Sequence, residues 1–331
     1  MNFSWPDDAP NIPDAPWVHS VLEQLAEKYD TVEEHGWYDN LNPTVDQILA
    51  DADDDYLLLD YSGGTGILAD RILRRAPDKS IGVLIADSSP KFLRLALEKL
   101  RHDPRVGYRL ISYLRSERRL QTLQEVMEPS LQTRGVDAIA STNAIHLYYG
   151  LSDTLRSWHE VLRPGGKLFV QSGNVHNPNA AEGSWIIDLT VEHIHRIAMD
   201  MVRDDDSLAH LRHHLADADY MAAHDKLRAK YFLPVRPVAY YVDALREAGF
   251  TDVREEAKPV RARCDDWYDF LAVYHEGVLG WVGGAEKITG EAASDETITL
   301  RKALMWRCMQ SLFDGADDFE ASWTYITATR T

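Results

Sequence analysis

Short apolar runs alternate with amphipathic stretches through the middle of the chain. The apolar runs predict five buried strands. The first begins at Leu57, and the others span Ile81–Ala86, Gly107–Ser112, Val136–Ser141 and Lys167–Gln171. Between the first two runs, apolar residues recur at helical spacing over Ile67–Arg74. Because strands and helices alternate in this way, the pattern predicts a doubly wound parallel sheet of the α/β class.

Residues typical of helix ends support these element boundaries. Ser89 and Pro90 follow the second strand and Asp87, and they are typical of a helix start. Towards the C-terminus, a helix over Ala239–Phe250 precedes a strand that begins at Val253, and the chain closes with a strand at Trp323–Ala328. These two strands extend the sheet formed by the first five.

Three further segments are helical in pattern. Apolar residues recur at helical spacing before the sheet, at Trp17, Val18, Val21, Leu22, Leu25 and Tyr29. We therefore expect residues 1–50 to fold over the sheet edge as a helical cap. Residues 174–235 predict a helical lid inserted after the fifth strand. Residues 262–316 predict a second insertion, which contains the aromatic run Trp267–Leu271.

Composition restricts the possible partners. The 331 residues are 45% hydrophobic, as expected for a globular chain, and their net charge of -18 disfavours nucleic acid and anionic membranes. The two cysteines lack paired spacing for a metal and are too few for a disulfide framework, so we expect a cytoplasmic protein. The N-terminus lacks the pattern of a secretion signal, and no apolar run is long enough to span a bilayer.

A glycine-rich turn follows the first strand directly, in the sequence Leu57–Gly66. Strand, glycine turn and helix N-terminus together predict a site for an adenosine-containing cofactor. Residues 64–69 also satisfy the G-x-G-x-x-A dinucleotide fingerprint, and Asp87 lies near the spacing of a ribose-binding carboxylate. A nicotinamide-dependent oxidoreductase is therefore an alternative at this point.

Four features together resemble class I S-adenosylmethionine-dependent methyltransferases over about two-thirds of the chain. They are the acidic glycine loop Leu59–Gly66, Asp87 at the end of the second strand, Val136–Ile139 at the start of the fourth, and Leu162–Val170 leading into the fifth. The resemblance implies a Rossmann-like, mostly parallel seven-stranded sheet with an antiparallel last strand, over residues 51–331. It also implies S-adenosyl-L-methionine as the cofactor.

The resemblance assigns a role to the residues around the turn. Asp87 would accept hydrogen bonds from the ribose hydroxyls, Asp60 would brace the loop, and Gly64 and Gly66 would lie against the methionine portion. The full predicted cofactor set is Asp60, Tyr61, Ser62, Gly63, Gly64, Gly66, Asp87, Ser88 and Asn143. Ser62 replaces the family's first loop glycine, and Ser112–Leu114 lacks the acidic residue often found near the adenine. Either aspartate could instead be an ordinary strand-end residue.

The predicted reaction is methyl transfer to oxygen, nitrogen or carbon of a small, apolar or aromatic metabolite. His146 after the fourth strand and His176 after the fifth are candidate bases, because imidazole titrates near neutral pH. Each histidine could instead only pack in its loop. We expect Tyr148 and Trp185 to form walls of the substrate pocket.

The sequence also bears on metals and on binding partners. His193 and His195 diverge on a helix, and His210, His213 and His214 suit a solvated surface, so we expect no metal. The expected partner is a small-molecule acceptor rather than nucleic acid or membrane, and the chain is a possible homodimer. A third interpretation is a cofactor-binding protein that has lost its chemistry and acts through an interaction surface.

Overall fold

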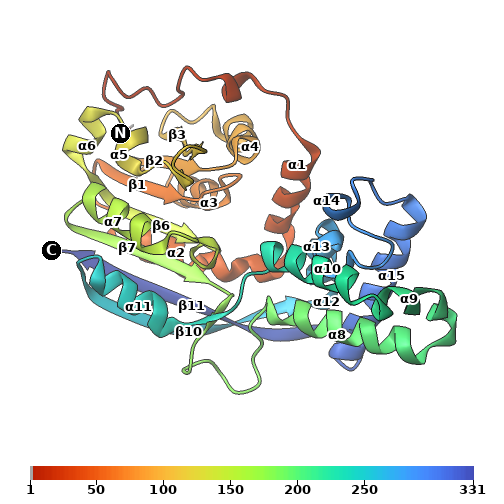
Figure 1. Ribbon diagram of the computed structural model, residues 1–331. Helices are drawn as coiled ribbons and strands as arrows, with labels where there is room; N and C mark the ends of the chain where they lie inside the picture. Colours follow the sequence, from red (N-terminus) through yellow and green to blue (C-terminus); the bar gives the residue numbers. More distant parts are fainter. Residues whose placement is uncertain (1–2) are drawn as a thin grey trace.

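A seven-stranded sheet forms the centre of the computed structural model, which describes residues 3–331 (Figure 1). Its strands are β1 (Tyr56–Tyr61), β2 (Ile81–Asp87), β3 (Val106–Leu110), β6 (Val136–Thr142), β7 (Leu162–Ser172), β10 (Phe250–Arg263) and β11 (Asp318–Arg330). They lie in the order β10-β11-β7-β6-β1-β2-β3. β11 runs antiparallel to both of its neighbours, β10 and β7, and the other neighbouring strands of the sheet pair in parallel. The structure thus confirms the Rossmann-like sheet with an antiparallel last strand.

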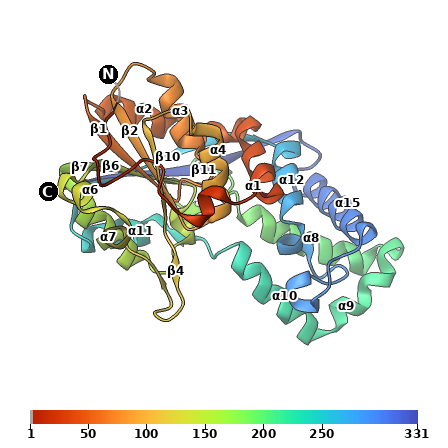
Figure 2. The same ribbon diagram turned by 90° about the horizontal axis from the view of Figure 1, so that it is seen from above.

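Two short strand pairs lie outside this sheet. One is the hairpin of β4 (Tyr113–Leu114) and β5 (Arg119–Leu120), and the other joins β8 (Val175–His176) to β9 (Arg236–Pro237). The hairpin projects from the body of the molecule beside the sheet (Figure 2).

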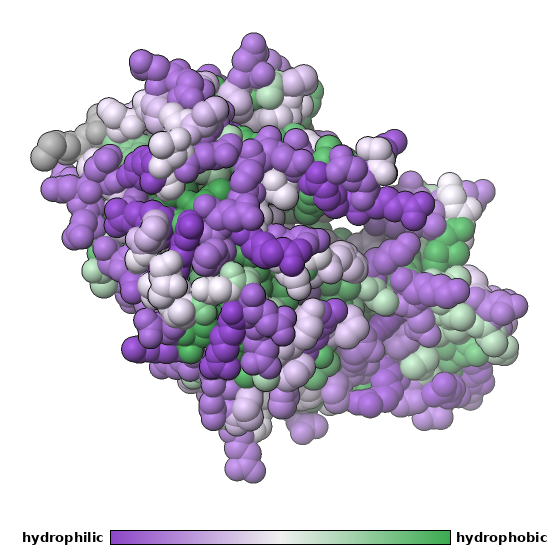
Figure 3. All heavy atoms as spheres, turned by 60° about the vertical axis from the view of Figure 1, so that its left-hand side comes forward, coloured by the Kyte–Doolittle hydropathy of each residue, from purple (hydrophilic) through white to green (hydrophobic). Residues whose placement is uncertain are grey.

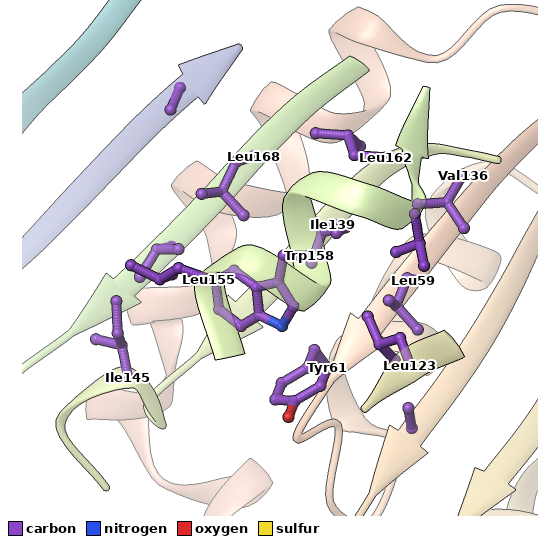
Figure 4. Packing of buried hydrophobic residues seen from close by; sticks show 14 of the residues in the cluster. Leu59, Tyr61, Leu123, Val136, Ile139, Ile145, Leu155, Trp158, Leu162 and Leu168 are labelled. Carbon is purple, nitrogen blue, oxygen red and sulfur yellow. The ribbon is translucent and has the colours of Figure 1, made fainter. Parts of the chain in front are cut away.

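Helices cover both faces of the sheet, which explains why its central strands are continuous apolar runs. β1 and β2 are buried along their whole length. One face packs against α2 (Asn42–Asp51), α3 (Ile67–Arg75) and α4 (Pro90–Leu100). The other packs against α5 (Leu123–Val126), α6 (Pro129–Arg134), α7 (Leu151–Val161) and α11 (Val238–Glu247). On that face, the Trp158 ring from α7 meets Tyr61 of β1 edge-on at a centroid distance of 5.1 Å (Figure 4).

The predicted helix starts are confirmed. α3 begins at Ile67, directly after Gly66, and α4 begins at Pro90. The Ser89 side chain caps α4 by accepting a hydrogen bond from the Phe92 N–H. The glycine turn and Asp87 are therefore held at the carboxyl ends of two neighbouring strands.

The Arg163–Gly166 segment belongs to β7 instead of preceding it as a separate turn. The pairing of β6 with β7 shifts at this segment, from Val136 opposite Leu162 to Ala138 opposite Lys167. The extra residues are held by Asp137 on β6. Its Oδ1 lies 2.7 Å from the Arg163 guanidinium, and its Oδ2 accepts the Leu57 N–H of β1 at 2.6 Å. One buried carboxylate therefore ties three central strands together.

The N-terminal region wraps the sheet and then crosses its carboxyl end. Its helical elements are η1 (Pro16–His19), α1 (Gln24–Asp30), η2 (Thr31–Glu34), η3 (Gly36–Leu41) and α2. The predicted apolar face is interrupted, because the Ser20 hydroxyl bonds back to the Trp17 carbonyl and the chain becomes extended there. Val21 is 86% exposed as a result. The Leu25 side chain, like residues 1–2, lies outside the described part of the chain.

A separate layer of helices lies beyond one end of the sheet (Figures 1 and 2). It consists of α8 (Leu189–Asp204), η5 (Asp206–Leu211), α9 (Arg212–Ala216), α10 (Ala218–Tyr231), α12 (Cys264–Val273), α13 (His275–Leu279), α14 (Glu286–Thr289) and α15 (Asp295–Leu312). The buried face of α8 packs on α15 and on the end of β11. None of the helices within residues 3–331 has the length and hydropathy needed to cross a membrane.

Arg301 on α15 holds a loop of this layer in place. Its guanidinium is completely buried and donates to the backbone carbonyls of Val282, at 2.8 Å, and of Gly280 and Gly284. We expect Arg301→Met to lower the free energy of unfolding by about 3 kcal/mol, because buried carbonyls would lose their donors. Urea denaturation measures this effect. Lys302→Met, on the partly exposed neighbour, is the control, and an equal loss in both variants would contradict the role given to Arg301.

Candidate active site

The glycine turn leaves one side of its backbone open. Gly64 and Gly66 have φ values of 56° and 80°, in the left-handed region that favours glycine. A Cβ on Gly63 would lie 2.6 Å from Asp60 Oδ2, so this position has no room for a side chain. A Cβ on Gly64 would meet no atom within 4 Å. The turn is therefore closed towards Asp60 and open on the side of Gly64.

Ser62 adopts a left-handed backbone, with φ of 59°, where the related family has glycine. For a residue with a side chain this conformation costs about 1 kcal/mol. Hydrogen bonds offset the cost, because the Tyr148 hydroxyl lies 2.9 Å from Ser62 Oγ and 2.8 Å from Ser141 Oγ. The serine is thus held by a polar chain that reaches from β6 to the turn.

Asp87 connects the turn to the start of α4. Its Oδ2 accepts the Gly64 N–H at 2.9 Å, and its Oδ1 accepts the Ser89 N–H at 2.7 Å. Burial raises the pKa of Asp87, and these backbone donors oppose that rise. Each carboxylate oxygen keeps one further lone pair, which matches the two hydroxyls of a ribose. Ser88, which follows, is exposed.

Asp60 lies beneath the turn without a hydrogen-bond partner among the described residues. Both of its carboxylate oxygens are buried and unpaired. Burial, and then the nearby Asp87, raise the pKa of Asp60 to about 7. A cationic ligand above the turn would relieve this repulsion between the two carboxylates. The open Gly64 backbone, the free lone pairs of Asp87 and the unpaired Asp60 all fit S-adenosylmethionine, which is an adenosine cofactor with a cationic methionine portion.

A cavity of about 340 Å³ lies between the N-terminal region, the sheet and the helical layer. Nine aromatic residues line it: Tyr29, Trp37, Tyr38, Tyr231, Phe232, Trp267, Phe270, Tyr274 and Trp323. The polar residues of its lining include Asn143, His146, Asn174, Asp188 and Lys230. Most of the face in Figure 3 is hydrophilic, and hydrophobic residues show in its central recesses and on its right-hand side.

Tyr29 links the cavity to α4, the helix that begins shortly after Asp87. Its ring stacks on Phe92 of that helix, with centroids 5.0 Å apart. Asn143, at the end of β6, also lines the cavity and has a left-handed φ of 53°. Its Oδ1 accepts the Trp323 indole N–H at 2.8 Å.

His146 is held by contacts on both ring nitrogens. Nδ1 lies 2.9 Å from Ser172 Oγ, and Nε2 lies 3.9 Å from Asp188 Oδ2. Burial lowers the pKa of His146 to about 4 and raises the pKa of Asp188 to about 7. Because Ser172 engages Nδ1, Nε2 is the nitrogen left to exchange a proton with Asp188 and with a ligand in the cavity.

The other predicted residues lie elsewhere. His176 is exposed on the short strand β8 and is not part of the cavity lining. Trp185 packs against His193 and Phe313, so the structure places it in the helical layer instead of in a wall of this cavity. Tyr148 also lies outside the lining, because its ring packs on Tyr61 and Trp158 under the turn.

Sequence reasoning missed several residues of the cavity. Asp188 precedes a helix and looks like an ordinary capping residue, so nothing in the sequence pairs it with His146. Trp37 and Tyr38 come from the N-terminal region. Trp267 and Phe270 belong to an aromatic run that the sequence assigns to the core, and Trp267 is indeed only 2% exposed while also lining the cavity.

Comparison with known proteins identifies the domain. A methyltransferase domain profile matches residues 59–170, which run from β1 into β7 and include the turn, Asp87 and His146. No curated protein matches the chain. The match is to methyltransferases, and it favours S-adenosylmethionine over the dinucleotide alternative.

Solved structures similar to this chain include two that are named as methyltransferases, one of them as putative, and a third that is named only as a protein. Phosphoethanolamine N-methyltransferase 2 of Haemonchus contortus, in complex with phosphomonomethylethanolamine and S-adenosylhomocysteine, is 14% identical, with 88% of this chain and 52% of that chain covered and a TM-score of 0.45. The present chain thus spans about half the length of that one. The YcgJ protein of Bacillus subtilis is 12% identical, with coverages of 88% and 98% and a TM-score of 0.48. A putative methyltransferase of Bacillus halodurans is 15% identical, with coverages of 87% and 97% and a TM-score of 0.45.

The domain match falls on the strands and loops that build the predicted cofactor site. The strand order and the single antiparallel strand are those expected from the family resemblance. Residues 59–170 therefore form a methyltransferase domain, within a fold that has the sheet order of S-adenosylmethionine-dependent methyltransferases.

Proposed function

We propose that the enzyme methylates a small, apolar or aromatic metabolite bound in the 340 Å³ cavity. The observation that carries this proposal is the position of the cavity: Asn143, directly after β6, lines it, and so does Tyr29, whose ring stacks on Phe92 of the helix that begins shortly after Asp87. Its volume lies at the lower end of the range for small-molecule sites, about 300 to 1,000 Å³. The net charge of -18 also favours a small acceptor over nucleic acid.

The cofactor supplies an electrophilic methyl group on a sulfonium, and the protein has to align the acceptor and remove its proton where there is one. We assign the removal of the acceptor's proton to the His146–Asp188 pair. A neutral imidazole with a pKa of about 4 is a weak base, and the ionised Asp188 carboxylate beside Nε2 strengthens it. The aromatic walls exclude water from the acceptor.

Calorimetric titration with S-adenosylhomocysteine, followed by a methylation screen with S-adenosylmethionine and small aromatic acceptors, tests the proposal. We expect binding of the cofactor product and methylation of at least one acceptor. A protein that binds the product and methylates none of a broad panel would argue against the proposed acceptor class.

The His146–Asp188 pair predicts the pH dependence of the reaction. The rate should rise as pH increases through about 7, because Asp188 is protonated below that pH and then cannot support His146. Asp188→Asn should remove this rise, and His146→Gln should lower kcat about 100-fold. Both variants should keep the affinity for S-adenosylhomocysteine. Steady-state rates between pH 5.5 and 9 measure the effect.

His176→Gln is the matched control for the histidine. We expect it to leave kcat within about twofold, because this side chain is exposed outside the cavity. If His176→Gln lost as much activity as His146→Gln, the assignment of the base would have to change. Cytoplasmic location and a homodimer stay predictions, which cell fractionation and sedimentation equilibrium would test.

A further inference from the structure

We propose that the methyl acceptor is an amine, which the cavity binds as a cation between its aromatic walls and the Asp188 carboxylate. The inference rests on the proposed function, because it concerns the acceptor of the same site. It narrows the possible acceptor atoms to nitrogen. The bound ammonium would first pass one proton to the His146–Asp188 pair, so that the freed lone pair could bond to the methyl carbon as the carbon–sulfur bond breaks and the cofactor leaves as a neutral thioether.

Asp188 occupies a capping position but does not cap its helix. It is the N-cap residue of α8, where an aspartate side chain ordinarily accepts a backbone N–H of the first turn, and here it makes no such bond. Its carboxylate accepts no hydrogen bond from any described residue, and its closest basic group is His146 Nε2 at 3.9 Å. The side chain is 19% exposed and lines the cavity. This carboxylate therefore lacks a cation, and the cavity is where one could be bound.

The walls of the cavity suit a cation as well. Aromatic faces carry negative potential and attract ammonium groups, most strongly where water is excluded. The Trp37 ring meets Trp267 edge-on, with centroids 5.7 Å apart and planes at 90°, so the cluster does not consist of parallel rings alone. Nine aromatic rings and the Asp188 carboxylate, with one lysine at the rim, form a lining that attracts a cation more than an anion.

The remaining titratable groups of the lining are compatible with a bound cation. His146 is neutral at physiological pH, because burial holds its pKa at about 4. The hydroxyls of Tyr29, Tyr38 and Tyr274 carry no charge, since burial or neighbouring groups raise the pKa of each above its usual value. Electrostatic attraction by the net charge of -18 would speed the approach of a cationic acceptor.

Lys230 is the residue of the lining that would favour an anionic acceptor. It lies in the last turn of α10 and is exposed, so solvent screens its ammonium group. An anionic acceptor would have to place its charge at this rim position and its body beside the buried Asp188 carboxylate. A cationic acceptor therefore fits the charges of the cavity better than an anionic one.

Calorimetry on the protein saturated with S-adenosylhomocysteine tests the inference. The probes are benzyltrimethylammonium, which has no proton to lose, its uncharged carbon isostere neopentylbenzene, and the anion phenylacetate. We expect the ammonium to bind at least about tenfold more tightly than the isostere. Asp188→Asn should remove about a factor of ten from ammonium binding and leave the isostere unchanged. Asp200→Asn, on an exposed position of the same helix, should change neither.

Three results would overturn the inference. Benzyltrimethylammonium could fail to bind at millimolar concentration, or neopentylbenzene or phenylacetate could bind as tightly as the ammonium. The preference for the ammonium could also survive in Asp188→Asn. Unchanged isostere binding shows that the variant cavity is folded. Failure of the proposed function is seen separately, since it appears as loss of S-adenosylhomocysteine binding or of all methylation. Methylation of phenols without any methylation of amines would reject the amine inference alone.

Discussion

Replacing Asp87 with alanine is expected to weaken S-adenosylhomocysteine binding at least 100-fold. The carboxylate has one free lone pair on each oxygen for a ribose hydroxyl, and it holds the Gly64 N–H at 2.9 Å. Hydrogen bonds to a charged group contribute about 1.5 to 3 kcal/mol each, so the loss of two corresponds to about 3 kcal/mol or more. Calorimetric titration of the variant measures the change.

Asp78→Ala is the control for Asp87. This aspartate is exposed on the loop before β2, at a distance along the chain from the turn, and its removal should leave the affinity unchanged. Thermal unfolding of both variants separates loss of binding from loss of folding. An Asp87→Ala protein that stays folded and keeps its affinity would show that the ribose is bound elsewhere.

Asp60→Asn is expected to stabilise the cofactor-free protein, and the gain should grow with pH. The pKa of Asp60 rises from 3.8 in a model peptide to about 7 in the fold, so the folded state binds the proton more tightly than the unfolded state. The wild-type protein therefore loses stability as pH rises from about 4 to 7, and the loss is complete above 7. Asparagine has the same shape and does not ionise.

The size of this effect follows from the pKa difference. Each pKa unit corresponds to 1.36 kcal/mol, so the stability gained by Asp60→Asn should be about 2 to 3 kcal/mol larger at pH 8 than at pH 5. Urea denaturation at both values measures it. Asp78→Asn should show no such difference. If the gain from Asp60→Asn were the same at both pH values, Asp60 would have to keep an ordinary pKa in the fold.

The local pattern of the chain was sufficient for most of the sheet. Strand positions, the helix starts at Ile67 and Pro90, and the adjacency of the glycine turn and Asp87 all follow from short-range signals. Apolar runs, capping residues and glycines act over a few residues, and consecutive parallel strands usually become neighbours. The inserted Arg163–Gly166 segment in β7 differs from the prediction because its pairing depends on Asp137, from another strand.

The cavity could not be predicted in the same way. Its residues come from the N-terminal region, from β6, from the start of α8 and from α12, which are far apart in the chain. The aromatic residues have the same local signature whether they fill a core or line a cavity, so Trp185 and Trp267 could not be told apart. His146 was predicted from its place after β6, but its partner Asp188 was not.

The sequence by itself determined the Rossmann-like sheet and the methyltransferase domain, and it predicted a cofactor turn at Leu59–Gly66, since those signals are local and lie in order along the strands. Only the tertiary structure decided which side chains line the cavity that we propose for the acceptor. It paired His146 with Asp188, left the Asp60 carboxylate without a partner among the described residues, and placed nine aromatic rings around one cavity. The physical reason is that burial and charge separation depend on contacts between distant segments, which no local pattern records.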